Sequence, residues 1–195
     1  MHSLALALSL FVLSQSALLV RLAEETSALE IGLWRMALAV PVLLLLGAIQ
    51  GQLVLLRKLR SGQLAALGLC GLSLFGHWFA WFMAVKQTSL ANSMVFFAVS
   101  PIFTALGAWM FFREPFERRH ALAMGLCFAG ILIIFRDSLR FDPSHLNGDL
   151  LALLASFLFS VYVLLGKGIR RKLGNLPFTI LTYSSAGLFF LACLL

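Results

Sequence analysis

Two strongly polar side chains, Arg35 and His77, lie well inside apolar runs of the 195-residue sequence. A helix rises by about 1.5 Å per residue, which gives the depth of each side chain. Arg35 falls roughly 10 Å and His77 about 15 Å from the helix end that we assign below to the outer side of a membrane. A guanidinium at that depth costs at least about 2.5 kcal/mol unless it faces protein or water. Arg35 would therefore contact an anion or a carboxylate in a cavity, or it would itself be one partner of a gate. Equally, it would brace two helices or extend toward the outer surface beside Trp34 and Glu30.

His77 and Trp81 are four residues apart and therefore share one face of a helix. An imidazole that hydrogen-bonds and an indole that stacks would suit a small substrate. Alternatively, Trp81 belongs to the aromatic belt at the membrane interface, an interpretation that also fits Trp34 and Trp109. Both interpretations stay open.

A polar stripe follows in the next run, where Asn92, Phe96, Ser100 and Thr104 recur at steps of four beside Pro101. Proline interrupts the backbone hydrogen bonds of a helix, so the stripe would form the wall of a pathway. Ser and Thr also bond across packed membrane helices, which makes a packing face the alternative. The polar side chains of five helices reach similar depths near the middle of the membrane. The predicted substrate-binding residues are Gln15, Arg35, His77, Trp81, Asn92, Ser100, Thr104 and Tyr162.

Seven apolar runs must position these side chains. The sequence is 61% apolar and 12% charged, against about 45–50% and 25% in soluble domains, which excludes a water-soluble globule. One helical crossing takes about 20 residues. The sequence therefore predicts an all-α, polytopic membrane helix bundle with about seven transmembrane helices. The runs are His2–Leu22, Ala28–Ile49, Gln63–Val85, Ala91–Phe112, His120–Phe135, Gly148–Gly166 and Pro177–Leu195.

Two further patterns predict local structure. Ser27 and Glu30 fit a capping box at the start of the second run. Small residues at steps of four predict close helix approach in the fifth and sixth runs. These residues are Ala121, Gly125 and Ala129, and Ala152, Ser156 and Ser160.

The sequence lacks the residue patterns that a proton relay, a phosphate-binding loop or a metal site would need. No Asp or Glu lies deep in any run, because Glu30 and Asp149 stand at helix starts, so facilitated exchange or uniport fits better than a carboxylate proton relay. No glycine-rich phosphate loop appears, and the three cysteines lack metal-ligand spacing. We expect no cofactor, no metal and no nucleic-acid partner. Apart from Arg35, the basic residues lie between the apolar runs or at their ends, and the net charge is +7.

Those basic residues predict the orientation, because Lys and Arg concentrate in cytoplasmic loops. One side of the membrane receives Arg57, Lys58, Arg60, Arg113, Arg118, Arg119, Lys167, Arg170, Arg171 and Lys172. The other side receives Arg21, Lys86, Arg136 and Arg140. We therefore expect a multi-pass protein of the inner or plasma membrane with a cytoplasmic N-terminus.

An internal repeat emerges when the sequence is shifted by 146 residues, which aligns the first run with the sixth. Phe11 then meets Phe157, and Arg21 meets Lys167. Five spans separate the two starts, so the copies must cross the membrane in opposite directions. Inverted repeats are typical of secondary transporters, whose substrate site lies near the midplane between the repeats.

The third to fifth runs resemble the drug/metabolite transporter superfamily of the EamA type. The segments that carry the resemblance are 77–81, 84–93, 100–105, 113–114 and 125–133. The resemblance implies a first five-helix repeat over 2–136 and the opening of a second, inverted repeat over 148–195. Such proteins usually have ten helices and move small metabolites, often outward. Here the second repeat stops after two helices, so a homo-oligomer or the absent C-terminal helices would complete the cavity.

The expected function is that of an integral membrane secondary transporter, which moves a small polar or zwitterionic metabolite by alternating access through the lipid bilayer. One alternative is a non-transporting fragment or assembly subunit. Another is a membrane-embedded lipid-modifying enzyme that uses His77 as acid or base and Arg35 to hold a headgroup.

Overall fold

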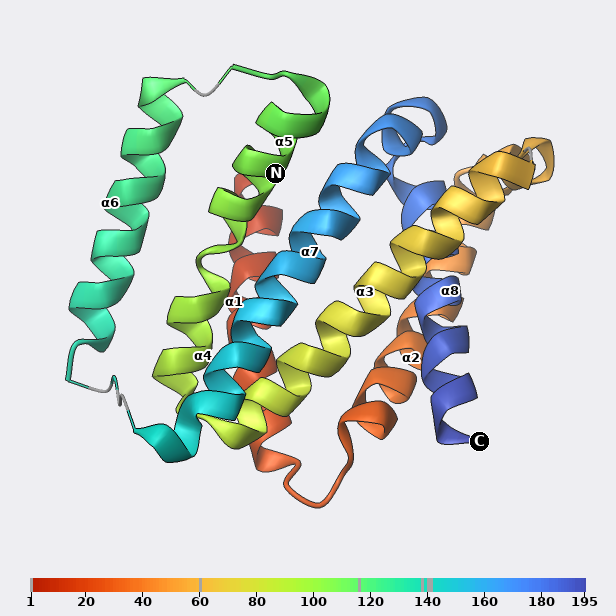
Figure 1. The fold of residues 1–195 in the computed structure, drawn as a ribbon. Coiled ribbons are helices and arrows are strands. Elements are labelled where there is room, and N and C mark those ends of the chain that lie inside the picture. Colours follow the sequence, from red (N-terminus) through yellow and green to blue (C-terminus); the bar gives the residue numbers. More distant parts are fainter. Residues whose placement is uncertain (1, 60, 116, 138, 140–141) are drawn as a thin grey trace.

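A computed structural model describes residues 2–59, 61–115, 117–137, 139 and 142–195. Within these ranges the chain forms eight α-helices and two short 3-10 helices, with no strand (Figure 1). The α-helices are α1 (His2–Leu22), α2 (Ala28–Ile49), α3 (Ser61–Gln87), α4 (Leu90–Phe97), α5 (Ser100–Phe112), α6 (Arg118–Phe135), α7 (Leu146–Leu173) and α8 (Asn175–Leu194). The 3-10 helices are η1 (Gln52–Lys58) and η2 (Pro143–His145).

Six helical segments of the described chain are long and apolar enough to cross a membrane. They are Ala28–Ile49, Ser61–Gln87, Leu90–Phe112, Arg118–Phe135, Pro143–Leu173 and Asn175–Leu194. The first predicted run also forms a helix, α1, of 21 residues. The prediction of an all-α, polytopic helix bundle is confirmed.

The fourth span is broken into α4 and α5, as Pro101 predicts. Proline has no N–H to donate to the carbonyl four residues earlier, which here belongs to Phe97. The Ser156 hydroxyl of α7 donates to that carbonyl at 3.4 Å. The Ser160 hydroxyl donates to the Ser100 carbonyl at 2.8 Å. Two serines of α7 thus supply donors at the break, and they fix α7 against it.

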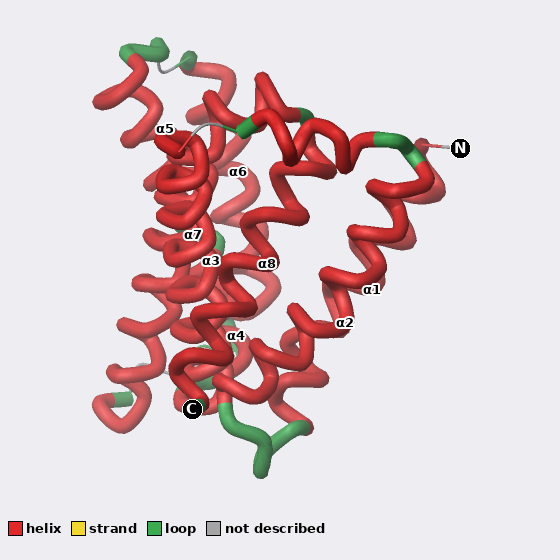
Figure 2. Tube along the Cα trace, turned by 90° about the vertical axis from the view of Figure 1, so that its right-hand side faces the viewer, coloured by secondary structure: helices red, strands yellow, loops and turns green. Residues whose placement is uncertain are grey.

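The centre of the bundle is the contact of α3 with α7, which lie side by side in Figure 1. The small residues that α7 turns inward, Ala152, Ser156 and Ser160, are at most 1% exposed, which confirms the packing row predicted there. Helix α8 packs against both α2 and α3. Figure 2 shows it between the α1–α2 pair and α3.

The predicted packing row of α6 is wrong for this chain. None of the described residues of α6 is buried, and a Cβ added to Gly125 would meet nothing within 4 Å. Figure 1 shows α6 at the edge of the bundle beside α4 and α5. The small residues permit close approach of a helix, but no described helix covers that face.

The chain segments that join the helices lie at two ends of the bundle (Figure 1). The α1–α2 loop, the α3–α4 turn and the start of α7 share one end, which we call the Gln87 end. The start of α3, the end of α5 and the α7–α8 turn share the other, which we call the Arg113 end. Figure 1 shows α3, α4 and α7 converging at the Gln87 end.

Two contacts order the α1–α2 loop at the Gln87 end. Ser27 and Glu30 form the predicted capping box, with each side chain accepting from the other's backbone N–H at 3.2 and 2.7 Å. The Lys86 ammonium at the end of α3 donates to the carbonyl oxygens of Ala23 at 2.7 Å and Glu24 at 3.1 Å, and also to that of Thr26. These carbonyls follow a helix C-terminus and have no helical N–H partners.

Replacing Lys86 with Met therefore removes the donor that holds this loop to α3. Hydrogen bonds to a charged group contribute about 1.5–3 kcal/mol, so we expect the thermal midpoint in detergent to fall by about 3–6 °C. The matched control is Lys172→Met, which makes the same chemical change at an exposed position of α7. Equal midpoints for the two variants would contradict the role of Lys86.

Candidate functional site

His77 lies at the centre of a group of aromatic rings. Its side chain is 4% exposed, and its Nδ1 lies 2.9 Å from the carbonyl oxygen of Ala155 on α7. A carbonyl can only accept, so Nδ1 carries the hydrogen. The ring centroid lies 5.5 Å from that of Phe97 and 5.1 Å from that of Phe159. The imidazole therefore has one fixed orientation between α3, α4 and α7.

Trp81 and Tyr162 belong to the same group of rings. The Trp81 ring lies 5.0 Å from Phe97, and the Tyr162 ring lies 6.1 Å from Phe159. Trp81 is 7% exposed, which is too buried for the interfacial belt, whereas Trp34 is 65% exposed. We call the rings of Trp78, Trp81, Phe97, Phe159 and Tyr162 around His77 the aromatic cluster.

Arg35 reaches the aromatic cluster from α2. Its guanidinium carbon lies 3.8 Å from the centroid of the Trp78 ring, a close cation–π contact. Its Nη1 donates to the Ser16 hydroxyl of α1 at 3.0 Å. None of the ion pairs formed within the described residues involves Arg35. The half-buried charge thus faces an indole and a hydroxyl in place of a carboxylate, and its contacts also brace α1, α2 and α3.

Trp78, which lies under the Arg35 guanidinium, carries an unsatisfied donor. Its Nε1 is the one buried side-chain nitrogen or oxygen that lacks a hydrogen-bond partner within the described chain. A buried donor without an acceptor costs about 1–3 kcal/mol. Trp78 was not among the predicted site residues. The spacing of four residues from His77 selects Trp81, and the sequence does not show that Arg35 approaches Trp78 from another helix.

The remaining predicted residues lie outside the aromatic cluster. Ser100 is buried at the α4–α5 break, and the Thr104 hydroxyl donates to its carbonyl at 3.0 Å. Gln15 is half-buried on α1, directly before Ser16. Asn92 is fully buried and contacts Asp149 of α7. The structure thus brings together Arg35, His77, Trp81 and Tyr162, and it places the other four around them along α1, α4 and α5.

Asn92 belongs to a second polar cluster, at the Gln87 end. The Asp149 carboxylate accepts from the Thr88 hydroxyl at 2.6 Å and from the Asn92 amide at 3.1 and 3.2 Å. The Asn92 amide oxygen accepts from the Ser89 hydroxyl at 2.9 Å. Asp149 is 8% exposed, although its place in the first turn of α7 predicts a residue near the surface.

Gly148 explains why Asp149 is buried. A Cβ at this position would lie 2.7 Å from the Gln87 carbonyl carbon and from the Thr88 nitrogen, so only hydrogen fits there. The start of α7 therefore touches the backbone of the α3–α4 turn. A glycine directly before an acidic residue was the sequence signal for this contact.

A groove of about 950 Å³ lies between α3, α5 and α7 at the Arg113 end. Its walls are almost entirely apolar, with Ala66 of α3, Leu106 and Met110 of α5, and Leu164 of α7 among them, and Lys172 stands at its mouth. Ser160 connects the groove to the α4–α5 break. None of the predicted substrate-binding residues lines it.

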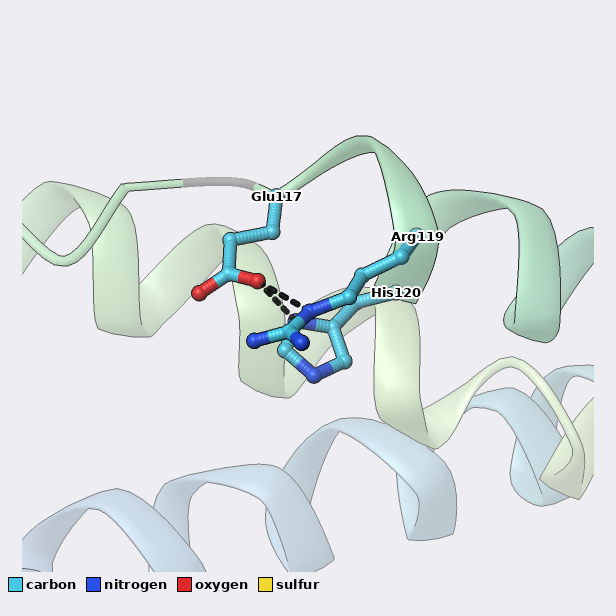
Figure 3. Close-up of polar contacts among 3 residues, drawn as sticks. All are labelled: Glu117, Arg119 and His120. Carbon is cyan, nitrogen blue, oxygen red and sulfur yellow. Dashed lines mark hydrogen bonds and ion pairs between the residues drawn. The ribbon is translucent and has the colours of Figure 1, made fainter.

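An exposed polar group at the start of α6 is shown in Figure 3. Glu117 pairs with Arg119 and lies 3.9 Å from the His120 Nδ1. These side chains are 43–78% exposed, and surface pairs of this kind contribute at most about 1 kcal/mol. Among the described residues, no three His, Cys, Asp or Glu side chains are grouped so that they could hold a metal ion.

Comparison with known proteins identifies the family of this chain. The model of the EamA-like transporter family matches residues 1–136, which run from α1 to the residue after α6. The chain belongs to the EamA-like transporter family. This EamA-family chain is therefore a multi-pass membrane protein of a transporter family, which favours transport over catalysis.

Two relatives of this EamA-family chain carry the description of uncharacterized transporters. The chain is 26% identical over 190 residues to one from Archaeoglobus fulgidus, which covers 95% of this chain and 64% of the relative. It is 23% identical over 154 residues to YyaM of Bacillus subtilis, which covers 77% of this chain and 50% of the relative. The chain therefore matches less than two thirds of the length of either relative. No solved structure matches the chain.

Substitution of Gly148 tests the contact that buries Asp149. Gly148→Ala forces a methyl group against the backbone of the α3–α4 turn, and overpacking of this kind costs about 1–3 kcal/mol. We expect the thermal midpoint in detergent to fall by about 3–8 °C.

The matched control is Gly168→Ala on the same helix, where a Cβ would meet nothing within 4 Å. Alanine is a better helix former than glycine by about 0.5–1 kcal/mol, so this variant is expected to be as stable as the parent or more stable. A Gly148→Ala protein that melts with the control would contradict the tight contact.

Proposed function

We propose that this EamA-family chain carries a small polar or zwitterionic metabolite across the membrane by alternating access. The chain acts as two inverted units, 2–136 and 148–195, which rock about the substrate between them. The predicted residues Gln15, Arg35, His77, Trp81, Asn92, Ser100, Thr104 and Tyr162 provide the polar contacts of the pathway. A second copy or further helices of a longer chain complete its wall.

The observation that carries this proposal is the guanidinium of Arg35, which forms no ion pair with another described residue, beside the unpartnered Nε1 of Trp78. Two donors in one place, one of them charged, fit a carboxylate, which accepts up to four hydrogen bonds. The neighbouring rings of Trp81 and Phe97 offer an apolar surface for the rest of the substrate. A zwitterion with an apolar or aromatic part matches both halves of this site.

The membrane orientation follows from the basic residues. Most of them lie at the Arg113 end, among them Arg113, Lys167 and Lys172. The positive-inside rule supports a cytoplasmic position for this end and for the N-terminus in an inner or plasma membrane. The Gln87 end then faces outward, and the groove between α3, α5 and α7 opens toward the cytoplasm.

A non-transporting assembly subunit is the second candidate. The observation that favours it is α6, whose small-residue face, around Gly125, is exposed and available for another helix. A carrier moves solute when it is the only protein in the membrane, whereas an assembly subunit does not. A flux experiment with purified protein distinguishes the two.

The decisive experiment is solute flux in proteoliposomes, with zwitterionic solutes each paired with the derivative whose carboxylate is converted to an amide. We expect the parent to prefer the zwitterion, and Arg35→Met to lose that preference by about ten-fold or more, because a hydrogen bond to a charged group contributes about 1.5–3 kcal/mol. His77→Ala is expected to lower flux of both solutes.

The matched control is Arg171→Met, which removes an exposed charge at the end of α7 and leaves the preference unchanged. Absence of flux for every solute in the parent rejects transport by this chain alone and favours the subunit. Equal preference in the parent and Arg35→Met rejects the assignment of Arg35 while flux itself persists.

A further inference from the structure

The two ends of the bundle differ in how tightly they are closed. At the Gln87 end, the start of α7 touches the α3–α4 turn at Gly148, with no room for a methyl group. At the Arg113 end, the groove of about 950 Å³ separates the walls formed by α3 and α5, and the exposed ion pair of Lys167 with Glu114 joins α7 to the end of α5. Helix α7 therefore packs directly on the α3–α4 turn at the Gln87 end, whereas a groove separates it from its neighbours at the Arg113 end.

Asp149 makes the shut end unusual, because its carboxylate is buried without a cation. No ion pair of the described residues includes it. The nearby Lys86 donates instead to three carbonyls of the α1–α2 loop. The elements around the carboxylate carry few titratable groups. Helix α3 contributes Lys86, and α4 contains no charged residue. His145, at the end of η2, has its Nδ1 3.3 Å from the Gln87 carbonyl oxygen.

Within the described residues, neutral donors and a helix N-terminus stabilise this carboxylate. Thr88 donates to it from the α3–α4 turn and Asn92 from α4, and the amide dipoles of the first turn of α7 favour a negative charge there. If α7 moved away from the turn, the carboxylate would lose its donors and need water in their place. The contact therefore holds while the end is shut and can be exchanged for water when the end opens.

We propose that Asp149, Thr88 and Asn92 form a latch that closes the outer end of the substrate pathway, and that this latch must break for the pathway to open outward. The inference rests on the proposed carrier function, in which α7 rocks against α3 and α4. It makes Asn92 a residue that positions α7 at the outer end of the pathway. A neutral latch of this kind opens without separating two opposite charges.

A buried cysteine beside Asn92 reports whether the latch is closed, because opening would expose this part of α4 to water. Ser93 follows Asn92 on α4, is fully buried and donates to the Leu90 carbonyl at 2.9 Å. Ser93→Cys changes one atom, so it disturbs the packing little. Cells that contain the variant are treated with a membrane-impermeant maleimide, and labelling at position 93 is read by peptide mass spectrometry. The peptide separates this position from Cys70, Cys127 and Cys193.

Each latch variant is combined with Ser93→Cys. Thr88→Val removes the hydroxyl at constant shape, and Asp149→Asn removes the charge. We expect both to label about ten-fold faster than Ser93→Cys alone, because a lost hydrogen bond to a charged group shifts the balance between closed and open states by that order. Thr88→Ser restores the hydroxyl and is expected to label at the slow rate.

Asp142→Asn is the matched control, since it neutralises an exposed carboxylate that caps η2 at the same end of the bundle. It is expected to label slowly. Size-exclusion profiles confirm folding, and Thr88→Val keeps the experiment decisive if Asp149→Asn does not fold.

Slow labelling in both latch variants overturns the proposal, and so does fast labelling in Ser93→Cys alone. The readout is a labelling rate and involves no solute. Absence of flux in proteoliposomes would therefore reject the carrier function, whereas unchanged labelling rejects the latch.

Discussion

Every backbone polar group within the hydrocarbon of a membrane must find its partner inside the protein. Pro101 breaks the fourth span and leaves the Phe97 carbonyl without its usual helical donor. The Ser156 hydroxyl replaces the lost donor, and the Ser160 hydroxyl adds a hydrogen bond to the Ser100 carbonyl. Both are possible because small residues let α7 approach the break. The same small face lies at the centre of the α3–α7 contact. One backbone requirement thus links the kink, the packing of α7 and the position of the aromatic cluster.

Two buried charges are accommodated in different ways. Arg35 lies over the ring of Trp78 and bonds a serine hydroxyl, while Asp149 accepts from a hydroxyl and an amide. They lie in separate clusters, and neither forms an ion pair with another described residue. A buried pair of opposite charges is costly to separate once formed. Because the two charges are kept apart, each is held by neutral side chains, and no ion pair between them has to be broken when the helices move.

The sequence predicted what depends on one helix at a time. Apolar run lengths located the helices, Pro101 located the break, and the capping box at Ser27 was found as expected. His77, predicted as a site residue from its place within an apolar run, is buried between three helices. The direction in which a side chain faces another helix could not be obtained this way, because it depends on contacts between distant segments. For that reason Trp78 and the buried state of Asp149 were missed, and the exposed small-residue face of α6 was predicted to be packed.

The broken fourth span also has a consequence for biosynthesis. Its carbonyls at Phe97 and Ser100 receive their hydroxyl donors from residues that follow 59 and 60 positions later in the chain. When the fourth span leaves the ribosome, α7 has not yet been synthesised. These two hydrogen bonds can therefore form only after α7 has been made, so the centre of the bundle is completed late in synthesis.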